Sequence, residues 1–520
     1  MSAIRQTEIT GRMEAHSKGK TAGLIAAMTR DVYDEATPGF EKINVESLTD
    51  ATAQRLRSKL KPLIEAYQSR LAGLSQDTDS VWNVIREGFG RDTGDQVAKQ
   101  ASAAWKDTIE TAVKDVTHAG RDLAVREDWR FMQFWETSRI RQFSEKEFLN
   151  DMMAEAKGGG LRVRDKANSE DATALAIPGI IQNAYRDIFH GRGEGGASGF
   201  SNKTRVFNFE DPESYIRMMQ KYGTGKGGLY NAMLGHVESM AKEIAWTQVF
   251  GPNYEAAFKK LQAVAEEDYT SRTLGKGLQQ VARGLIRDTP IGATHIFQHL
   301  TGQLSAVENE MMAGIMGGLR NVSTFARLGG AIISAVPGDS VTAGLAAQHM
   351  GMAPTAVLSR LVKDLVTDRE GGNEIAAQLG LSSASIMDSA LGAKRFQDEI
   401  AGSGLSGRLA ETVIRIQGLQ AWTEGLKRAF SMEAMGMVAR QSDFAFEQTD
   451  PAFRNFLQSY GFTAKEWDDL RAAPQLTAEG ARFFDPQSVT DRRLADRMLS
   501  AIIDERRFAV IEPDARVRSM

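Results

Sequence analysis

The sequence contains no cysteine. Disulfide bonds, thiolate metal sites and cysteine nucleophiles are therefore all excluded. A chain without cysteine can pass between reducing and oxidising compartments without mispaired disulfides, although chance alone also explains the absence. Proline is scarce as well: only 12 of the 520 residues are proline, and none lies between Pro62 and Pro178. Because proline disrupts helix interiors, this gap favours long helices.

Long hydrophobic runs and a strong net charge are also missing. No stretch reaches the roughly 18 consecutive apolar residues of an ordinary transmembrane helix, and residues 1–20 show no apolar signal-peptide region. The net charge of −4 creates no global field that would recruit DNA or an acidic membrane, although a local basic patch remains open. With 42% hydrophobic and 25% charged residues, the composition is that of a globular protein.

Apolar residues recur at spacings of three and four over most of the chain, as in the series Leu60, Ile64, Tyr67 and Leu71. This is the period of an amphipathic helix, so residues 45–155 and 405–509 are predicted to be helical. Several helix boundaries carry their own signals. These are Asp211-Pro212, Asp450-Pro451 and Thr463 with Glu466 as helix starts, and Gly251-Pro252-Asn253 as a stop followed by a start.

Two short alternating runs interrupt the helical pattern, at residues 161–164 and 205–209. They predict one small two-stranded ribbon within 158–210, with two irregular loops as the alternative. The fold class is therefore all-α, an elongated multi-helix bundle with strands confined to 158–210. The predicted regions are a long-helix region at 1–157, a Gly-rich linker at 158–210, a central helical domain at 211–404 and a C-terminal helical region at 405–520.

Signals for catalysis or metal binding are weak. His295 and His299 are four residues apart, but zinc needs further ligands and no glutamate base stands between them. We therefore predict no catalytic residue, no cofactor and no metal. The arginines of "DRRLADRML" and "DERRFAV" could contact phosphates, but each has acids within one turn. Salt-bridged, solvated helix faces are the simpler interpretation of Arg492, Arg493, Arg497, Arg506 and Arg507.

From Leu328 to Ser359 the only Asp, Glu, Lys or Arg is Asp339. Breaks at Pro337 and at Pro354 predict a hairpin of short helices in this segment, 328–359. A buried soluble core is the simplest interpretation. The alternative is a segment that is buried in one state and faces lipid or a channel partner in another, since Met and Gly suit repacking. The candidate membrane- or channel-facing residues are Leu328, Ile332, Ile333, Val336, Asp339, Val341 and Leu345.

A second candidate surface lies on the long helix predicted near the C-terminus. Its large apolar side chains could exceed what its own bundle covers, which predicts self-association of the chain. The residues are Trp422, Leu426, Phe430 and Met432, and ordinary core packing is the alternative.

Four blocks of the sequence resemble a family of tailed-phage internal virion, or ejection, proteins that also occurs within large polyvalent phage proteins. They are "GRGEGGASGFSNKTRVFNFEDPESYIRMMQKYG", "LYNAMLGHVESMAKEIAWTQVFGPNYEAAFKKL", "NVSTFARLGGAIISAVPGDSVTAG" and "GSGLSGRLAETVIRIQGLQAWTEGLKRAFSMEAMG", the last with the terminal "RRFAVIEPDARVRSM". Together they cover about residues 190–520, and none is a catalytic signature.

The resemblance implies a non-enzymatic protein that is stored in the virion and delivered with the genome to help form a DNA conduit across the host envelope. Implied partners are portal, tail or other ejection proteins, further copies of the chain, a transient membrane contact and non-specific DNA contact. Implied locations are the capsid or tail and, after ejection, the host periplasm or cell envelope. Two alternatives remain: a peptidoglycan-cleaving enzyme or module, and a soluble virion scaffold or tail adaptor.

Overall fold

The computed structural model describes residues 3–4, 6–7, 9–11, 21–29, 43–63, 79–121, 131–165, 170–190, 206–273, 290–301, 331–366, 406–478 and 480–510. Within these ranges the fold is mostly helical, as the sequence predicts. The chain divides into two compact units: unit 1 comprises residues 1–5 and 59–252, and unit 2 comprises residues 6–58 and 253–520. Residues 6–58, here called the arm, therefore belong with the C-terminal half of the sequence. The predicted boundaries after 157 and 210 fall inside unit 1, and the one after 404 falls inside unit 2.

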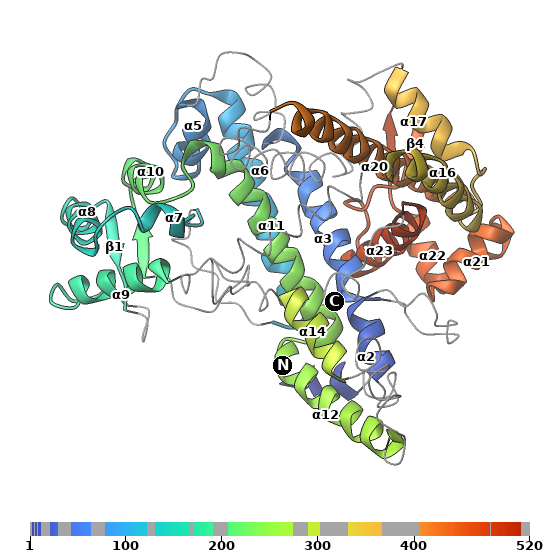
Figure 1. Ribbon diagram of the computed structural model, residues 1–520, viewed down its shortest axis with the longest axis horizontal. Coiled ribbons are helices and arrows are strands. Elements are labelled where there is room, and N and C mark those ends of the chain that lie inside the picture. Colours follow the sequence, from blue (N-terminus) through green and yellow to red (C-terminus); the bar gives the residue numbers. More distant parts are fainter. Residues whose placement is uncertain are drawn as a thin grey trace. The chain divides into compact units, whose positions relative to one another are not determined.

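Unit 1 is built around buried aromatic side chains. Its helices are α5 (Asp79–Gly88), α6 (Gln96–His118), α7 (Thr137–Ile140), α8 (Glu145–Lys157), α9 (Ile177–Phe189), α10 (Pro212–Lys221) and α11 (Gly225–Phe250) (Figure 1). Helix α6 packs against α5 and α11, and α8 packs against α9. Trp105 and Phe131 are buried with their rings stacked 6.2 Å apart, and Tyr215 lies beside Phe131. Aromatic pairing of this kind adds to the burial of apolar area in the core.

The ribbon predicted within 158–210 is present in unit 1. Strand β1 (Leu161–Val163) pairs antiparallel with β2 (Phe207–Phe209), with Leu161 opposite Phe209 and Val163 opposite Phe207. The four terminal side chains face the core, whereas the central Arg162 is exposed and lies 3.2 Å from a Glu210 carboxylate oxygen. This is the inward–outward alternation of a half-buried strand, so the prediction is confirmed.

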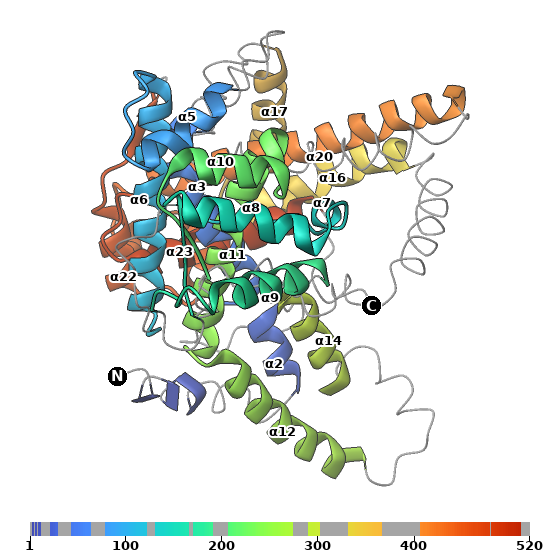
Figure 2. The ribbon, with the colours of Figure 1, turned by 90° about the vertical axis from the view of Figure 1, so that its left-hand side faces the viewer.

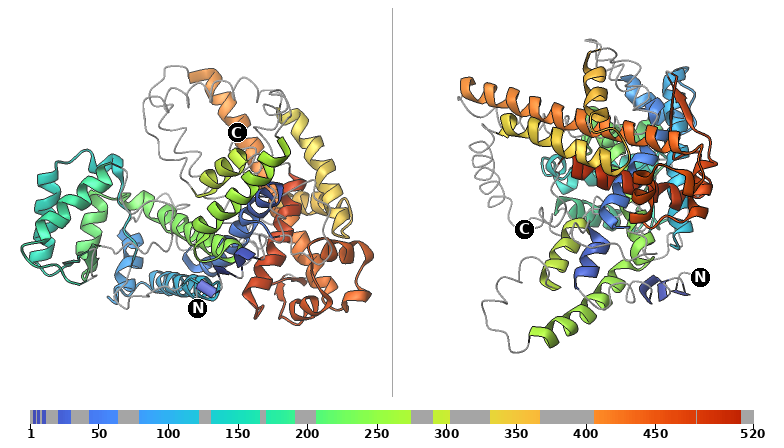
Figure 3. Two further views of the ribbon diagram at one scale, coloured as in Figure 1. Left: turned by 90° about the horizontal axis from the view of Figure 1, so that it is seen from below. Right: turned by 90° about the vertical axis from the view of Figure 1, so that its right-hand side faces the viewer.

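Unit 2 joins the arm to the C-terminal helices. The arm contributes α2 (Thr21–Met28) and α3 (Val45–Lys59, all but its last residue), and α2 packs against α12 (Tyr254–Thr273) and α14 (Pro290–Thr301) (Figure 2). The remaining helices are α16 (Ala331–His349), α17 (Ala356–Val366), α20 (Ser406–Gln441), the 3₁₀ turn η2 (Phe446–Gln448), α21 (Pro451–Ser459), α22 (Ala464–Arg471) and α23 (Arg492–Ala509). Helices α16 and α20, yellow and orange in Figure 3, run side by side.

The prediction that strands are confined to 158–210 is wrong, because unit 2 contains a second hairpin. Strand β3 (Leu476–Ala478) pairs antiparallel with β4 (Ala481–Phe483). Gly480 has φ +74°, a left-handed conformation that glycine adopts without a steric penalty and that lets the chain reverse within the turn. Strand β4 packs against α20 and buries Phe483, which gives this short hairpin the apolar support that an isolated pair lacks.

The break predicted at Pro337 is also wrong. Helix α16 continues from Ala331 through Pro337 to His349. An interior proline removes one backbone hydrogen bond, and tertiary packing can offset that loss. Ala343, Ala346 and Ala347 are fully buried in the core of unit 2, which supplies such packing. The break predicted near Pro354 is confirmed, since α16 ends before Gly351, which has φ +78°, and α17 starts at Ala356. The helical hairpin is therefore α16–α17.

The predicted helix starts and the stop are confirmed by their caps. The side chain of Asp211 accepts a hydrogen bond from the Ser214 amide at the start of α10, and Asp450 accepts from the amides of Ala452 and Phe453 at the start of α21. Thr463 and Glu466 form a reciprocal capping box at α22. Gly251, at φ +90°, ends α11, and α12 begins three residues later. Such caps satisfy the backbone amides that a helix N-terminus leaves without partners.

Candidate functional site

A row of buried polar and charged side chains joins α3 of the arm to α23. We call it the α3–α23 junction. Bonded partners in it are 441 to 461 residues apart in the sequence. Arg55 of α3 bonds to Asp496, whereas Ser47, nearer the start of α3, bonds to Asp504, so the two helices run antiparallel. The junction comprises Asn44, Glu46, Ser47, Asp50, Thr52 and Arg55 from the arm with Asp496, Asp504 and Arg507 from α23.

Arg55 and Asp496 form the most deeply buried ion pair of the junction. The Arg55 Nε and Nη2 atoms donate to the two carboxylate oxygens of Asp496 at 2.6 and 3.0 Å, and Thr52 Oγ1 donates to the same carboxylate at 3.2 Å. The two charged side chains are 1% and 0% exposed. Such a two-pronged pair is strongly directional, and removing two charges from water offsets much of its attraction. Its main effect is therefore to fix the register of α3 on α23.

Asp504 binds the first turn of α3. The side-chain amide of Asn44 donates to Asp504 Oδ2 at 3.3 Å, and the Ser47 hydroxyl donates to Oδ1. The Asn44 Oδ1 atom in turn accepts a hydrogen bond from the Ser47 backbone amide at 2.8 Å. Asn44 is therefore both the cap of α3 and a bond to α23.

Arg507 binds two acids on one face of α3. Its Nη2 donates to Asp50 Oδ2 at 2.8 Å, and its Nη1 lies 3.3 Å from Glu46 Oε2. Glu46 and Arg507 are buried, whereas the Asp50 side chain lies at the rim and is 43% exposed. Burial acts to raise the pKa of Asp50, but the positive charges of Arg507, Arg506 and Arg57 outweigh it and hold that pKa below its ordinary value of 3.8.

The far end of α3 and the neighbouring helices are tied to α23 by further polar groups. The side-chain amide of Gln487, just before α23, donates to the Arg55 carbonyl and to Ser58 Oγ. On another face of α23, Glu505 accepts a hydrogen bond from the Tyr460 hydroxyl at 2.8 Å, and its second oxygen lies 3.2 Å from His349 Nδ1. Because His349 ends α16 and Tyr460 follows α21, Glu505 links three helices through one buried carboxylate.

The interpretation of the α23 arginines as solvated faces needs correction at two positions. Arg497 and Arg507 are buried, whereas Arg492, Arg493 and Arg506 keep partial exposure. Arg497 donates to Glu466 at 2.6 Å and lies over the Phe462 ring at 4.5 Å. Other elements of unit 2 provide acidic partners for both buried arginines: Glu466 of α22 for Arg497, and Glu46 and Asp50 of α3 for Arg507.

The structure divides the predicted membrane- or channel-facing residues into two groups. Leu328 lies outside the described residues, and Ile332, Ile333 and Val336 belong to α16 without described side chains. The other three lie in the described part of α16, where Val341 is 65% and Leu345 53% exposed, but Asp339 is only 8% exposed. Helix α16 thus turns its one carboxylate inward and two large apolar side chains outward.

Asp339 and Trp422 come from the two different predicted sets, and the structure brings them together. Burial raises the pKa of Asp339, and the nearby Trp422 indole opposes this only in part. The indole N–H makes no hydrogen bond of ordinary geometry, which fits a weak opposing effect. The Asp339 carboxyl is therefore held in surroundings that favour its neutral form.

Three of the four residues predicted to mediate self-association are fully buried within the chain. Leu426, Phe430 and Met432 are 0% exposed and belong to the core formed by α16, α20, α21, α22 and α23. Only Trp422 is partly exposed. These side chains follow the core-packing alternative, because α16 and α23 cover the face of α20 that the sequence left without a partner.

The α3–α23 junction was not predicted from the sequence. Its charges were visible, but local periodicity carries no information about partners more than 440 residues apart. One usable signal was present: Asp496, Asp504 and Arg507 follow one another along α23 in the order acid, acid, base, and Glu46, Asp50 and Arg55 follow the same order along α3. Two such helices are complementary in charge when they run antiparallel. A search for complementary charged faces between distant helices would have paired them.

The chain matches no protein-family model, no characterised protein and no solved structure. Within the described ranges, no three His, Asp or Glu side chains gather closely enough to hold a metal ion, and His295 and His299 lie on α14 without such a group. In the same ranges, none of the helices combines the length and hydropathy that crossing a bilayer requires.

Proposed function

We propose that the chain is a non-enzymatic structural protein of a tailed-phage virion. It is stored inside the particle as an internal or ejection protein, leaves with the genome, and helps to form a DNA conduit across the host cell envelope. The sequence blocks within residues 190–520 support this assignment. The observation that carries it is the orientation of α16.

Helix α16 buries its alanines in the core as an ordinary surface helix does, but it departs from that pattern at Asp339, Val341 and Leu345. Its carboxylate, Asp339, is buried, and Val341 and Leu345 face outward one turn apart. A water-facing helix normally exposes its charge and buries its large apolar side chains. The arrangement suits a helix whose outer face contacts an apolar surface in a second state of the protein. That surface is either a lipid or another virion protein.

The α3–α23 junction is consistent with a protein that has two states. Its contact faces carry several charged groups, so separating α3 from α23 exposes surfaces that water solvates well. Because helices form mostly local contacts, the separated parts can also refold quickly after passage through a narrow tail. Both properties suit a chain that is packed, moved and reassembled.

The proposed partners follow from this role. They are portal, tail or other ejection proteins, further copies of the chain, a transient membrane contact and non-specific DNA contact. The proposed locations are the capsid or tail and, after release, the host periplasm or cell envelope.

Mass spectrometry of purified virions before and after DNA release tests the proposal. We expect peptides from the whole chain in full particles and their loss from emptied ones. A chain that is absent from full particles contradicts the virion assignment. A chain that remains in emptied particles contradicts delivery and supports a fixed scaffold or tail adaptor.

A further inference from the structure

Unit 2 consists of the continuous stretch 253–520 and of the arm, which precedes the main stretch of unit 1, residues 59–252. Its helix α3 fits α23 through complementary charges in a fixed antiparallel order: Arg55 to Asp496, Ser47 to Asp504, and Glu46 and Asp50 to Arg507. The surface of α23 is therefore a binding site for one particular helix. Every copy of the chain carries that helix.

We propose that two copies of the chain join by exchanging arms, so that α3 of one copy occupies the α3–α23 junction of the other. The junction is the same in both forms, because the same side chains meet in the same register. The buried Arg55–Asp496 pair rejects a shifted or foreign helix, since a misplaced partner leaves a charge buried without its counter-charge. A second copy of α3 is the partner that meets all of these requirements. The proposal does not depend on the virion assignment.

Exchange of the whole arm requires α3 to separate from α23 and α2 to separate from α12 and α14. Of the eleven buried residues of α3, six are polar or charged: Glu46, Ser47, Thr52, Gln54, Arg55 and Arg57. An undocked α3 therefore presents a mixed polar face that water can solvate while the helix finds a new partner. High protein concentration then favours the exchanged dimer by mass action.

Two single charge reversals test the exchange. Arg55→Asp places two acids at the junction of every R55D chain, and Asp496→Arg places two arginines at the junction of every D496R chain. In either variant alone, position 55 of α3 and position 496 of α23 carry charges of the same sign. This holds for α3 of the same chain and for α3 of an identical copy. When the two are mixed in denaturant and refolded together, exchange produces one junction in which both charges are reversed and one with the native Arg55–Asp496 pair.

The expected result is a mixed dimer that neither variant forms alone, detected with two different affinity tags and by sedimentation. The double variant R55D/D496R is the matched control, because it carries a reversed pair within one chain. If the control folds and the mixture yields only single chains or aggregates, arms dock only within their own chain and the proposal fails.

A second measurement avoids charge reversal and uses the absence of native cysteine. Chains with Ser47→Cys and chains with Asp504→Cys are refolded together under reducing conditions and then oxidised, so that a disulfide forms where these two buried, contacting positions meet. Exchange predicts a crosslinked dimer that contains both variants and that either variant alone does not give. The chain with both substitutions reports docking within one copy by an internal crosslink. A mixture without a mixed dimer in either assay overturns the proposal.

Discussion

The side chains of Arg55 and Asp496 are buried, so water cannot replace either partner when the other is removed. Substituting Arg55 with Ala leaves the Asp496 carboxylate buried without the guanidinium that donates to both of its oxygens. We expect the free energy of unfolding of unit 2 to fall by about 3–5 kcal/mol, the usual cost of breaking a buried ion pair. Denaturant titration followed by circular dichroism measures it.

Two controls separate this effect from a general loss of charge. Lys465→Ala breaks the exposed pair with Asp469, where an i,i+4 contact contributes about 0.3–0.5 kcal/mol. The double variant R55M/D496L replaces both charges with apolar groups, and we expect it to lose far less stability than R55A. A loss below about 1 kcal/mol in R55A contradicts a tightly packed junction.

Asp339 and Asp50 are expected to respond to pH in opposite directions. Burial raises the pKa of Asp339, so the folded state prefers the neutral carboxyl and the ionised form opposes folding. The pKa of Asp50 is lowered, with the charges of Arg507, Arg506 and Arg57 outweighing the opposing effect of burial, so its ionised form favours folding above its ordinary pKa of 3.8. We therefore expect Asp339→Asn to raise Tm at neutral pH and Asp50→Asn to lower it.

The two variants control for each other, because each replaces one carboxylate with its amide. The difference caused by Asp339→Asn should shrink as the pH falls from the raised folded-state pKa of Asp339 towards the ordinary value of 3.8. The difference caused by Asp50→Asn should shrink only below pH 3.8, as the pH falls towards the lowered folded-state pKa of Asp50. Thermal unfolding across a pH series provides the measurement. Tm shifts of the same sign in both variants at neutral pH would contradict the opposite pKa shifts of Asp339 and Asp50.

Gly351 affects both the turn after α16 and the start of α21. It has φ +78°, and a Cβ atom there would lie 2.7 Å from Asp450 Oδ1 and 3.2 Å from the Phe453 amide nitrogen. That carboxylate caps α21, so Gly351→Ala would disturb the turn after α16 and the start of α21 together. We expect a loss of about 2–4 kcal/mol in the free energy of unfolding, from backbone strain plus the lost cap.

Gly480→Ala is the matched control for this prediction. Gly480 has a similar φ of +74°, but no atom lies within 4 Å of the position that a Cβ atom would take there. We expect only the conformational cost, about 1–2 kcal/mol. Equal losses of unfolding free energy in both variants would mean that the close approach of Gly351 to Asp450 does not contribute to the cost of the substitution. Denaturant titration of the two proteins side by side decides between the outcomes.

The outer face of α16 provides the test of its proposed apolar contact. Val341→Asp and Leu345→Asp place charges on exposed positions, so we expect each to change stability by no more than about 0.5 kcal/mol. Liposome flotation of the released protein should weaken in both variants. Ala346→Asp, on the buried face of the same helix, should instead unfold unit 2. Flotation that is unchanged in V341D and L345D excludes lipid as the apolar partner of this face.

At the scale of elements, the sequence predicted what local chemistry controls. Asp211, Asp450 and Thr463 cap helices where their spacing indicated, because a cap depends on residues within one turn. The continuous helix through Pro337 was mispredicted, since the packing of Ala343 and Ala347 against distant residues outweighs one missing hydrogen bond. The β3–β4 hairpin was missed for the same reason, because Phe483 finds its support on α20.

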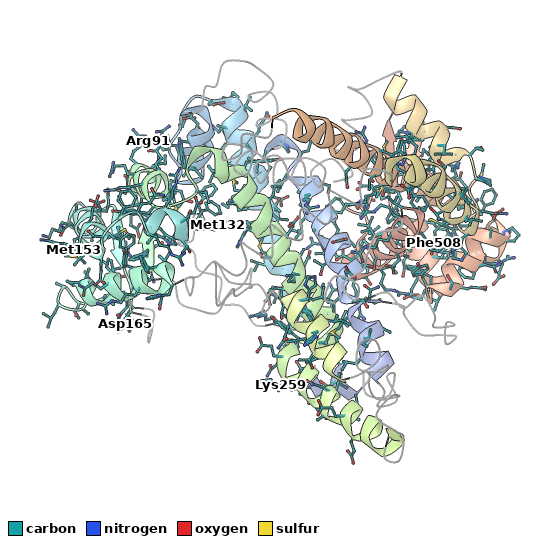
Figure 4. The ribbon with its side chains drawn as sticks, viewed as in Figure 1. Arg91, Met132, Met153, Asp165, Lys259 and Phe508 are labelled. Carbon is teal, nitrogen blue, oxygen red and sulfur yellow. The ribbon has the colours of Figure 1, made fainter. Side chains whose placement is uncertain are left out.

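The division into two units could not be read from composition. The Gly-rich linker predicted at 158–210 suggested boundaries on either side of it, but this stretch lies within unit 1 and contributes both strands of the β1–β2 ribbon. The decisive contacts are side-chain pairs such as Arg55–Asp496, which join residues 441 positions apart. Figure 4 shows the side chains of the described residues, with Phe508 labelled on α23 among those of unit 2.

For the whole molecule, removal of the arm should affect the two units differently. In a chain that begins at residue 59, unit 2 lacks α2 and α3 but unit 1 keeps its helices. We expect amide hydrogen exchange to accelerate strongly in α23, whereas α6 and α11 keep their protection. The R55A chain is the control, because it retains the arm and weakens only the junction. Unchanged protection of α23 contradicts a discontinuous unit 2.

The distance along the chain between α3 and α23 also has a consequence for synthesis. Arg55 is synthesised 441 residues before Asp496. At about 5–20 residues per second, the arm waits roughly 20 to 90 s for its partner. During that interval an apolar face would invite aggregation with neighbouring nascent chains. The polar residues Glu46, Asp50 and Arg55 let α3 remain in water until α23, the last described helix to be made, has been synthesised.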